Sequence, residues 1–396
     1  MGQDALLLRN GRLLSCVPGD DGPDGEVRDI IIRAGVIEKV GRMLECEHAA
    51  VLDLDGAWVT PGLIDACTRM GLDVLEAGEG DRDSDEISGP VQPGLKVSDG
   101  IDFLDPAFRD AQSGGISTVY VGPGETNVLG GQGAILKTWA EAPAGMLVRD
   151  PADLKAVIGD PPRRAYRERK IAPVTRMGEV GLIRACFESV RSGSSSLDRS
   201  GTGVVGRVLS GALPLRVHAK AARDIGVALR LSREFGIDLI IEHANGACGL
   251  DLERQDVKIQ DVKIVFGPLM AAAYDRDSLD GGPGCAASLL KRGVPLALTT
   301  DHPTIPVQDL RVLAGLLVGE GVSSQEAIRT VTLYPARVLG IDHAVGTIEP
   351  GKQADIAVFT KHPLDITARV KMLFIGGREV LAREAREREG RGLESI

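Results

Sequence analysis

Short apolar stretches alternate with longer amphipathic stretches through the middle of the chain. The amphipathic stretches carry apolar residues near i, i+3 and i+4 spacing, which is the period of a helix with one buried face. Strands are therefore predicted at 117–121, 215–218, 239–243, 263–266 and 296–301, and helices at 220–235, 282–291 and 324–339. This alternation is typical of parallel strands wrapped by helices, so we predict an α/β fold.

Both ends of the chain show a strand pattern without helices between the strands. Strands are predicted at 6–14, 29–33 and 36–40 near one end, and at 355–359 and 370–375 near the other. We expect the two ends to form one small domain. The predicted organisation is a composite β-sandwich from 1–59 and 345–384, a barrel from 60–344, and a solvated charged tail from 385–396.

Several segments carry turn or loop signals. The serine- and glycine-rich segment 192–203 is predicted to be a mobile loop, because it has too little apolar surface to pack. Residues 122–124 and 130–133 are glycine-rich but lack the Lys-Ser/Thr that follows a phosphate-binding loop, so we interpret them as tight turns. The acidic run 79–86 is expected to face water, with a lid as the alternative.

The charge balance narrows the class of partner. A formal net charge of -10 argues against nucleic acid or an anionic membrane, because both attract basic surfaces. No apolar run reaches the roughly 18 to 20 residues of a membrane helix, and the first residues lack the basic and apolar regions of a signal peptide. We therefore expect a cytoplasmic protein whose partner is a small molecule or a peptide.

The cysteines and the remaining histidines add little chemistry by their spacing. The 6 cysteines lie far apart without a CxxC pair, so neither a disulfide framework nor a zinc ribbon is predicted. Most of them are expected to be small buried apolar residues. His48, His343 and His362 lie in predicted loops and are expected at the surface.

Four stretches together resemble the amidohydrolase superfamily: Val59-Thr-Pro-Gly-Leu-Ile-Asp65, the strand that ends in His243, Thr299-Thr-Asp-His-Pro-Thr-Ile-Pro306, and Gly346-Thr-Ile-Glu-Pro-Gly-Lys-Gln-Ala-Asp-Ile-Ala-Val-Phe359. A second signature at 121–124 and 127–138 is similar to that of imidazolonepropionase-related amidohydrolases. The resemblance implies a (β/α)8 TIM barrel with its site at the C-terminal strand ends and a β-sandwich built from both chain ends. It also implies hydrolysis of a C–N bond and a homo-oligomer.

The metal-binding pattern of that family is incomplete in this chain. In the family the first barrel strand ends in His-x-His, because residues i and i+2 of a strand aim two imidazoles at one zinc. Here Cys67 and Arg69 occupy those places. The resemblance carries over His218, His243 and Asp301, which we predict as the catalytic residues. If a zinc is bound, Cys67 joins these three as its predicted ligands.

Arg69 is the main reason to predict a degenerate site without a metal. The strand period puts its permanently charged guanidinium on the same side as Cys67, where it would repel a dication by several kcal/mol at an effective dielectric constant of about 20. Arg69 is instead expected to pair with Asp301 and to replace the charge of the metal. We therefore favour no cofactor, and zinc stays open as the alternative.

Five residues are predicted to bind substrate: Arg69, Lys137, Lys220, His302 and Asn127. Lys137 lies in a family-matched Leu-Lys-Thr and points either toward substrate or toward a structural acid. Cys67 is expected to be an inert thiol, or a nucleophile if a neighbouring cation lowers its pKa. The loops 76–96 and 125–133 are expected to select the substrate, although they carry no readable ligand signature.

Three hypotheses follow from these residues. The first is an enzyme that acts on an amide, imide or cyclic C–N bond by metal-independent acid/base chemistry at His218 or His243 and Asp301. The second is a non-catalytic relative whose barrel binds a ligand or a partner chain. The third is a mononuclear zinc-dependent C–N hydrolase in which Asp301 serves as the base.

Overall fold

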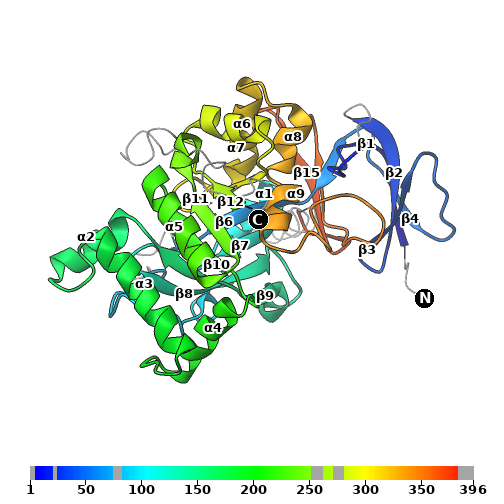
Figure 1. Cartoon of the computed structure of the whole chain (residues 1–396). Helices are drawn as coiled ribbons and strands as arrows, with labels where there is room; N and C mark the ends of the chain where they lie inside the picture. The colour runs from blue at the N-terminus through cyan, green and yellow to red at the C-terminus, as the bar shows by residue number, and fades with distance from the viewer. Residues whose placement is uncertain (1–4, 21–24, 75–82, 251–261, 271–280, 382–396) are drawn as a thin grey trace, which may run out of the picture.

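The computed structural model describes residues 5–20, 25–74, 83–250, 262–270 and 281–381. Two eight-stranded sheets organise the chain, and the barrel sheet lies beside a smaller sheet (Figure 1). The predicted fold class, a TIM barrel with a second domain, is confirmed. The charged tail at 385–396 and the acidic residues 79–82 lie outside the described residues.

The smaller sheet combines strands from both ends of the chain. Its order is β16-β15-β14-β5-β1-β2-β3, with β4 pairing β1. Alternate apolar residues of these strands, among them Leu8, Ile30 and Phe374, pack into a separate core. Its strands are β1 (Ala5–Leu13), β2 (Glu26–Arg33), β3 (Val36–Gly41), β4 (Ala50–Asp53), β5 (Trp58–Pro61), β14 (Ile356–Phe359), β15 (Val370–Ile375) and β16 (Arg378–Glu379).

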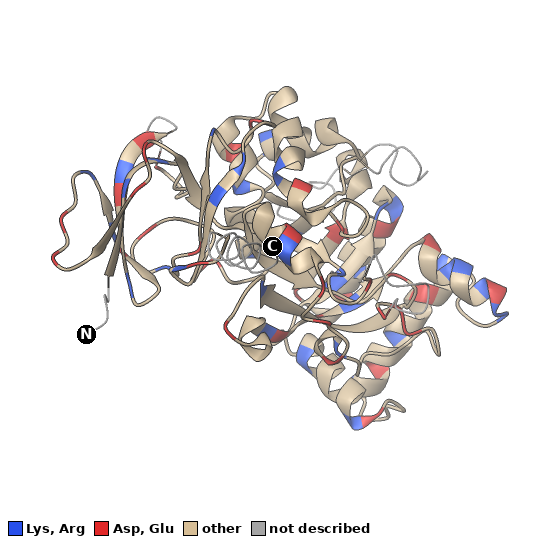
Figure 2. Cartoon of the chain, turned by 180° about the vertical axis from the view of Figure 1, so that it is seen from behind, with Lys and Arg blue, Asp and Glu red and all other residues tan. Residues whose placement is uncertain are grey.

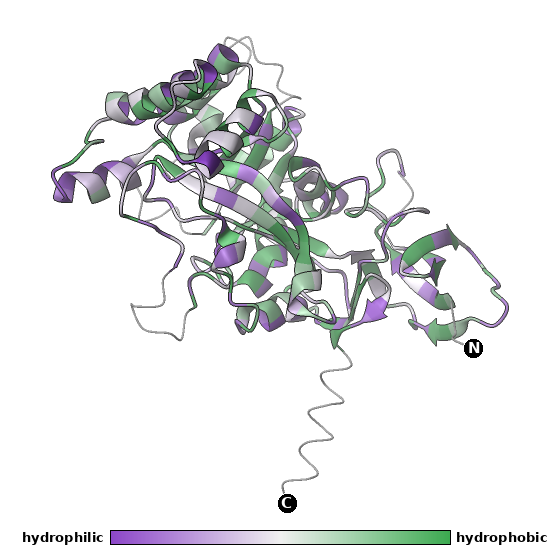
Figure 3. Cartoon of the chain, turned by 90° about the horizontal axis from the view of Figure 1, so that it is seen from below, coloured by the Kyte–Doolittle hydropathy of each residue, from purple (hydrophilic) through white to green (hydrophobic). Residues whose placement is uncertain are grey.

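The barrel sheet runs in sequence order, from β6 to β13, and an isolated parallel bridge between Thr68 and His302 joins its two edges. Its strands are almost entirely buried, and Figure 3 shows them as largely hydrophobic, whereas hydrophilic positions gather on the surrounding helices. The strands are β6 (Leu63–Thr68), β7 (Ile116–Val121), β8 (Leu129–Lys137), β9 (Leu147–Val157), β10 (Leu215–Ala219), β11 (Leu239–His243), β12 (Lys263–Phe266) and β13 (Leu296–Leu298).

Strand β8 runs antiparallel to both of its neighbours, β7 and β9, in an otherwise parallel barrel. Sequence analysis missed β8 and β9, and its interpretation of 130–133 as a tight turn is wrong, because these residues lie inside β8. The glycines have a packing role instead. The ring and hydroxyl of Tyr120 fill the space that a Cβ at Gly122 or Gly133 would need.

Nine helices of at least six residues surround the barrel within the described segments. Two predictions need correction here. The segment 192–203 is not all loop, because α4 begins at Arg199 and the Asp198 side chain accepts a hydrogen bond from the Gly201 amide. The helices are α1 (Ala107–Ser113), α2 (Asp160–Glu168), α3 (Arg176–Arg191), α4 (Arg199–Leu209), α5 (Ala222–Phe235), α6 (Pro283–Lys291), α7 (Leu310–Gly319), α8 (Ser324–Arg329) and α9 (Leu333–Val338).

The second correction concerns the helix predicted at 324–339, which is two helices, α8 and α9. Pro335 has no amide hydrogen to donate to Val331, and the Val331 carbonyl accepts a hydrogen bond from Ile64 in β6 instead. The described helices include none long and apolar enough to cross a membrane.

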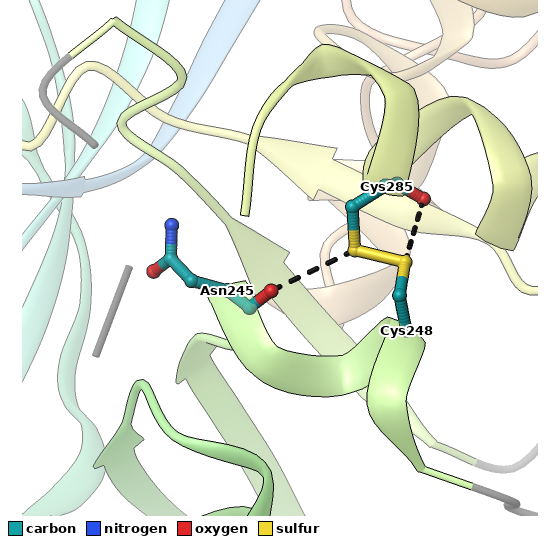
Figure 4. Close-up of a disulfide and its surroundings, with 3 residues drawn as sticks. All are labelled: Asn245, Cys248 and Cys285. Carbon is teal, nitrogen blue, oxygen red and sulfur yellow. Dashed lines mark hydrogen bonds between the residues drawn. A yellow bond between two sulfur atoms is a disulfide. The ribbon is translucent and has the colours of Figure 1, made fainter. Parts of the chain in front are cut away.

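A disulfide joins Cys248 to Cys285, which corrects the expectation that the cysteines form no such bond (Figure 4). Cys248 lies in the short 3-10 helix Asn245–Gly249 that follows β11, and Cys285 lies in the first turn of α6. The sequence separation of 37 residues gave no spacing signal, so only the fold brings the two thiols together. Disulfides are rare in the cytosol, and the cytoplasmic location stays a prediction.

Candidate functional site

The C-terminal ends of the barrel strands bring together the three residues predicted to be catalytic and Cys67, the additional ligand predicted if a zinc is bound. Cys67 lies in β6, His218 in β10 and His243 at the end of β11, while Asp301 follows β13. Parallel strands of a barrel end on one face, so these side chains converge there. All four are at most 5 % exposed.

Left-handed backbone turns aim two of these side chains. His243 has φ 71° and Asp301 has φ 51°, although neither is glycine. In a regular strand His243 would face away from its neighbour Glu242, because successive side chains alternate between the two faces. The turn at His243 lets both side chains point at the same region. Such conformations cost free energy and are typical of functional sites.

Glu125 lies at the centre of the cluster and was missed by sequence analysis. Its Oε1 atom is 3.2 Å from His218 Nδ1 and 3.1 Å from His243 Nε2. Within the described part of the chain neither ring nitrogen has a hydrogen-bond partner. The available signal was position, since Glu125 is the first acid after β7 and strand ends line the site.

The tautomer of His243 places a lone pair, rather than a hydrogen, opposite the carboxylates of the cluster. His243 Nδ1 is 2.7 Å from the Gly267 carbonyl oxygen, which can only accept, so Nδ1 carries a hydrogen. In the neutral ring Nε2 then presents its lone pair to carboxylates of Glu125, at 3.1 Å, and Asp301, at 3.9 Å. Lone pair and carboxylate repel each other, so this space favours either a proton on Nε2 or a bound cation.

A fully buried layer of paired charges lies beneath the cluster. Lys155 Nζ is 2.7 Å from Glu242 Oε1, and Arg216 is 2.6 Å from Asp153 and 3.3 Å from Glu242. The Tyr120 hydroxyl donates to Asp153, and the Arg216 guanidinium lies over the Tyr120 ring. Burial alone would raise the pKa of Glu242, but Lys155, His218 and Arg216 together outweigh it and hold that pKa well below its usual range. Sequence analysis did not single out this layer.

Arg69 forms the expected pair with Asp301, with a nitrogen to oxygen distance of 3.6 Å. It also lies 3.8 Å from Glu125 and 3.2 Å from Asp73. Burial alone would lower the pKa of Arg69, but Asp301 and Glu125 outweigh it and raise that pKa. The guanidinium charge is therefore offset by three carboxylates rather than left to repel a cation.

Cys67 is buried, and its Sγ atom lies 4.0 Å from Asp301 Oδ1. Burial first, and the charge of Glu242 second, raise the pKa of the thiol well above its usual range. A thiol held protonated is a poor nucleophile and a poor metal ligand. The structure therefore favours the inert thiol among the two alternatives.

Among the other predicted substrate-binding residues, Lys220 and His302 lie next to residues of the cluster, whereas Asn127 has a structural role. Lys220 directly follows β10, and its charge acts to lower the pKa of His218. His302 is buried, its carbonyl accepts from the Arg69 amide, and burial lowers its pKa. Asn127 is occupied structurally, because it donates to the Glu86 carbonyl and accepts from the Tyr166 hydroxyl.

Lys137 is not part of this cluster, which corrects its prediction as a substrate-binding residue. Because β8 is antiparallel, Lys137 pairs in register with Thr118 near the start of β7, away from the strand ends that form the site. Its ammonium lies 2.6 Å from Asp355, which precedes β14 of the smaller sheet. The structure therefore shows the alternative role, pairing with an acid.

A cavity of about 270 Å³ is linked to Arg69 through two residues. Arg69 pairs with Asp73, whose carboxylate accepts from Ser84 at 3.0 Å, and Ser84 lines the cavity. Other lining residues come from the loops after β6 and β7, including Leu72, Glu86, Lys96 and Pro123. Ser84, Glu86 and Lys96 fall in the loop 76–96 that was expected to select a substrate, whereas Leu72 and Pro123 lie outside the two expected loops.

Comparisons with known proteins identify the family of this chain. Residues 219–380 match the model of the amidohydrolase family. A solved amidohydrolase from Thermotoga maritima MSB8 is 34% identical, with a TM-score of 0.88, and the match covers 95% of this chain and 99% of that chain. The chain belongs to the amidohydrolase superfamily. This membership supports a hydrolase that acts on C–N bonds.

Two curated relatives are more distant. The imidazolonepropionase of Maricaulis maris is 26% identical, over 96% of this chain and 98% of its own length. The amidohydrolase tasK of Hapsidospora irregularis is also 26% identical over 95% of this chain, but this chain spans only 43% of its length.

The residues present fit a divalent metal ion of the kind that this fold commonly holds. Ligand atoms of Glu125, His218 and His243 all lie within 4.8 Å of one another. Two imidazoles and a carboxylate are a competent donor set for zinc. The second group with suitable spacing, Cys67, Glu242 and His243, is weaker, because its thiol is held protonated and Lys155 already neutralises Glu242.

Proposed function

We propose that this chain hydrolyses a C–N bond of a small molecule and that Glu125, His218 and His243 hold one divalent metal ion for this reaction. The observation that carries the proposal is the convergence of His218 Nδ1 and His243 Nε2 on Glu125, both buried and both without a hydrogen-bond partner in the described part of the chain. Buried polar atoms without partners are costly, and a ligand that satisfies them explains why they persist.

The charges around the cluster support a cation. Glu125, Asp73 and Asp301 surround one guanidinium, that of Arg69, so this group keeps an excess of negative charge. A bound divalent ion would offset that excess. It would supply Lewis-acid polarisation of a carbonyl and a more acidic water.

The side chains of this chain have separable roles in the proposed reaction. Asp301 takes a proton from the attacking water and returns it to the leaving nitrogen, while the new C–O bond forms and the C–N bond breaks. Arg69 and Lys220 orient an anionic group of the substrate. The Gly267 carbonyl fixes the tautomer of His243, so that Nε2 always faces the cluster.

Metal content measured by plasma mass spectrometry, after dialysis against zinc, tests the ligand set. We expect about one ion per native chain, and less than about a tenth of that in Glu125→Gln and His218→Asn, because each lost ligand typically costs several kcal/mol. Cys67→Ala is the matched control and should retain the ion. Loss of metal in Cys67→Ala alone would instead support the ligand set inferred from the sequence.

Activity is tested with a panel of N-acyl amino acids and cyclic imides, by measuring the release of amine or the opening of the ring. Asp301→Asn should lower any turnover by at least about a hundredfold, since proton transfer typically contributes that much, while its metal content stays near one. A fully loaded protein that cleaves no member of the panel would argue against the substrate class.

Metal-independent acid/base chemistry is the second candidate, and one observation favours it. Burial alone would lower the pKa of His218, but Glu125 outweighs it and raises that pKa, so the two residues can form an imidazolium and carboxylate pair. If the native chain binds no zinc, nickel or iron and yet hydrolyses the panel, this candidate replaces the first.

A further inference from the structure

A second cavity, of about 710 Å³, opens between α2 and the start of α3. Four arginines line it, Arg163, Arg164, Arg167 and Arg176, together with Asp160, Glu168 and the first residues of α3. This volume is in the range of sites that hold small molecules. The cavity shares no lining residue with the catalytic cluster.

The segment that forms this cavity has a charge opposite to that of the whole chain. Residues 160–176 contain six basic residues and two acidic ones, whereas the whole chain carries a net charge of -10. Figure 2 shows the basic positions following one another along the projecting α2. A local basic concentration in an acidic protein attracts anions, because a hollow surface focuses the field of its charges.

Two of the four arginines are structural and two are not. Arg163 is buried and pairs with Asp160 and Glu179, and Arg176 pairs with Asp224 at 2.6 Å. Among the described residues Arg164 has no ion-pair partner, and Arg167 donates a hydrogen bond to the uncharged Val174 carbonyl at 3.0 Å. The cavity therefore has fixed walls and two uncompensated guanidinium groups.

Exposed apolar side chains lie on the segment that borders these charges. Ile171, Val174 and Met177 are 45%, 41% and 82% exposed, and the last two line the cavity. A ligand that places anionic groups on the arginines would also find an apolar surface beside them. Such a mixture of arginine and apolar contacts is typical of a recognition surface.

Helix α2, which lines the cavity, is attached to the catalytic face of the barrel. The amide of Ile158, at the end of β9, donates to the His218 carbonyl at 3.0 Å, and α2 begins two residues later. The Tyr166 hydroxyl of α2 bonds to Asn127 in the loop after β7. Helix α2 is therefore fixed to the same strand ends that carry the candidate active site.

We propose that this cavity binds a small molecule that carries at least two phosphoryl or carboxylate groups. The planar guanidinium group pairs with either oxyanion through two parallel hydrogen bonds, and Arg164 and Arg167 supply two such groups. The shared requirement is a doubly anionic ligand, and it does not depend on the proposed hydrolysis or its metal.

Isothermal titration of the full-length chain with inorganic pyrophosphate and with citrate, at constant ionic strength, tests the proposal and separates the two chemistries. The Arg164→Ala, Arg167→Ala double variant should weaken binding of the preferred probe at least tenfold. The matched control is Arg207→Ala, Arg292→Ala, which removes two exposed arginines elsewhere and should change the affinity by less than twofold. Thermal unfolding of both variants checks that the fold is intact.

Titration of a further variant distinguishes binding in this cavity from binding at the catalytic cluster. Glu125→Gln should keep the binding of the probe, because Glu125 does not line the cavity. The proposal is overturned if neither probe binds, if both double variants lose affinity equally, or if only Glu125→Gln loses it. In the last case the probe binds at the proposed metal site instead.

Discussion

Two buried layers of the barrel contain ionisable groups, and they differ in how these groups are paired. In the lower layer Lys155, Arg216, Asp153 and Glu242 each have an oppositely charged partner within 3.3 Å. In the upper layer the imidazoles of His218 and His243 meet Glu125 without a hydrogen bond. The charges of the lower layer offset one another, whereas the upper layer has two imidazole nitrogens that face one carboxylate. Arg216 Nη2 and Glu242 Oε1 of the lower layer also lack a hydrogen-bond partner among the described residues, so neither buried charge nor an unpartnered atom alone marks a functional site. The upper layer differs because its donor atoms converge on one carboxylate.

The largest effect is expected for Arg216→Met, which removes the central cation of the lower layer. Asp153 would lose its charged partner and Glu242 one of its two, in a fully buried environment. The free energy of unfolding should fall by about 3 to 5 kcal/mol, measured by urea denaturation at pH 7. Glu125→Gln in the metal-free protein is the matched control and should change it by less than about 1 kcal/mol. Similar losses in both variants would mean that the two layers do not differ in their contribution to stability.

Asp65 is a buried carboxylate whose partners are hydroxyl and amide groups rather than a cation, so it can be compared with the charge-paired Glu242. Burial raises the pKa of Asp65 to about 6, although Thr299 and Thr300 donate to it. The folded chain therefore holds this proton more tightly than the unfolded chain. The contribution of this proton to stability is full below about pH 4 and is lost as the pH rises through about 6, by up to about 3 kcal/mol.

Urea denaturation of the native chain and of Asp65→Asn across pH 4 to 7 measures this contribution. The difference in unfolding free energy between the two proteins should shift in favour of Asp65→Asn as the pH rises. A constant difference over this range would mean that Asp65 is ionised throughout, as the charge-paired Glu242 is expected to be.

The smallest of the three effects is expected for Lys137→Met, at the opposite end of the barrel from the site. This change leaves the buried Asp355 carboxylate with a hydrogen bond from the Gly376 amide but without its charged partner. We expect a loss of about 2 kcal/mol, less than for Arg216, because Lys137 is partly exposed. Metal content and turnover of the panel should stay unchanged. A change in substrate affinity would restore Lys137 as a substrate-binding residue.

Much of the fold could be predicted because it depends on local patterns. Periodicity located five barrel strands within a few residues, and the apolar strands near both ends indicated the second sheet. Strand β8 escaped prediction because glycine is a weak strand former, and the side chain of Tyr120 on the neighbouring strand occupies the space that a Cβ at Gly133 would need. Strand β9 escaped prediction because Pro151 and charged residues interrupt its apolar pattern. The antiparallel direction of β8, which removed Lys137 from the site, follows from pairing that no local pattern encodes.

The sequence by itself determined which chemical groups end the barrel strands: His218, His243 and Asp301, with Cys67 and Arg69 where the family has histidines. Strand period and order are enough for that, because parallel strands end on one face. Only the tertiary structure decided how those groups combine. It brought Glu125 between the two imidazoles, offset Arg69 with three carboxylates, and joined Cys248 to Cys285. These contacts link residues far apart in the chain, and their distances are set by the packing of the whole barrel rather than by any local stretch of sequence.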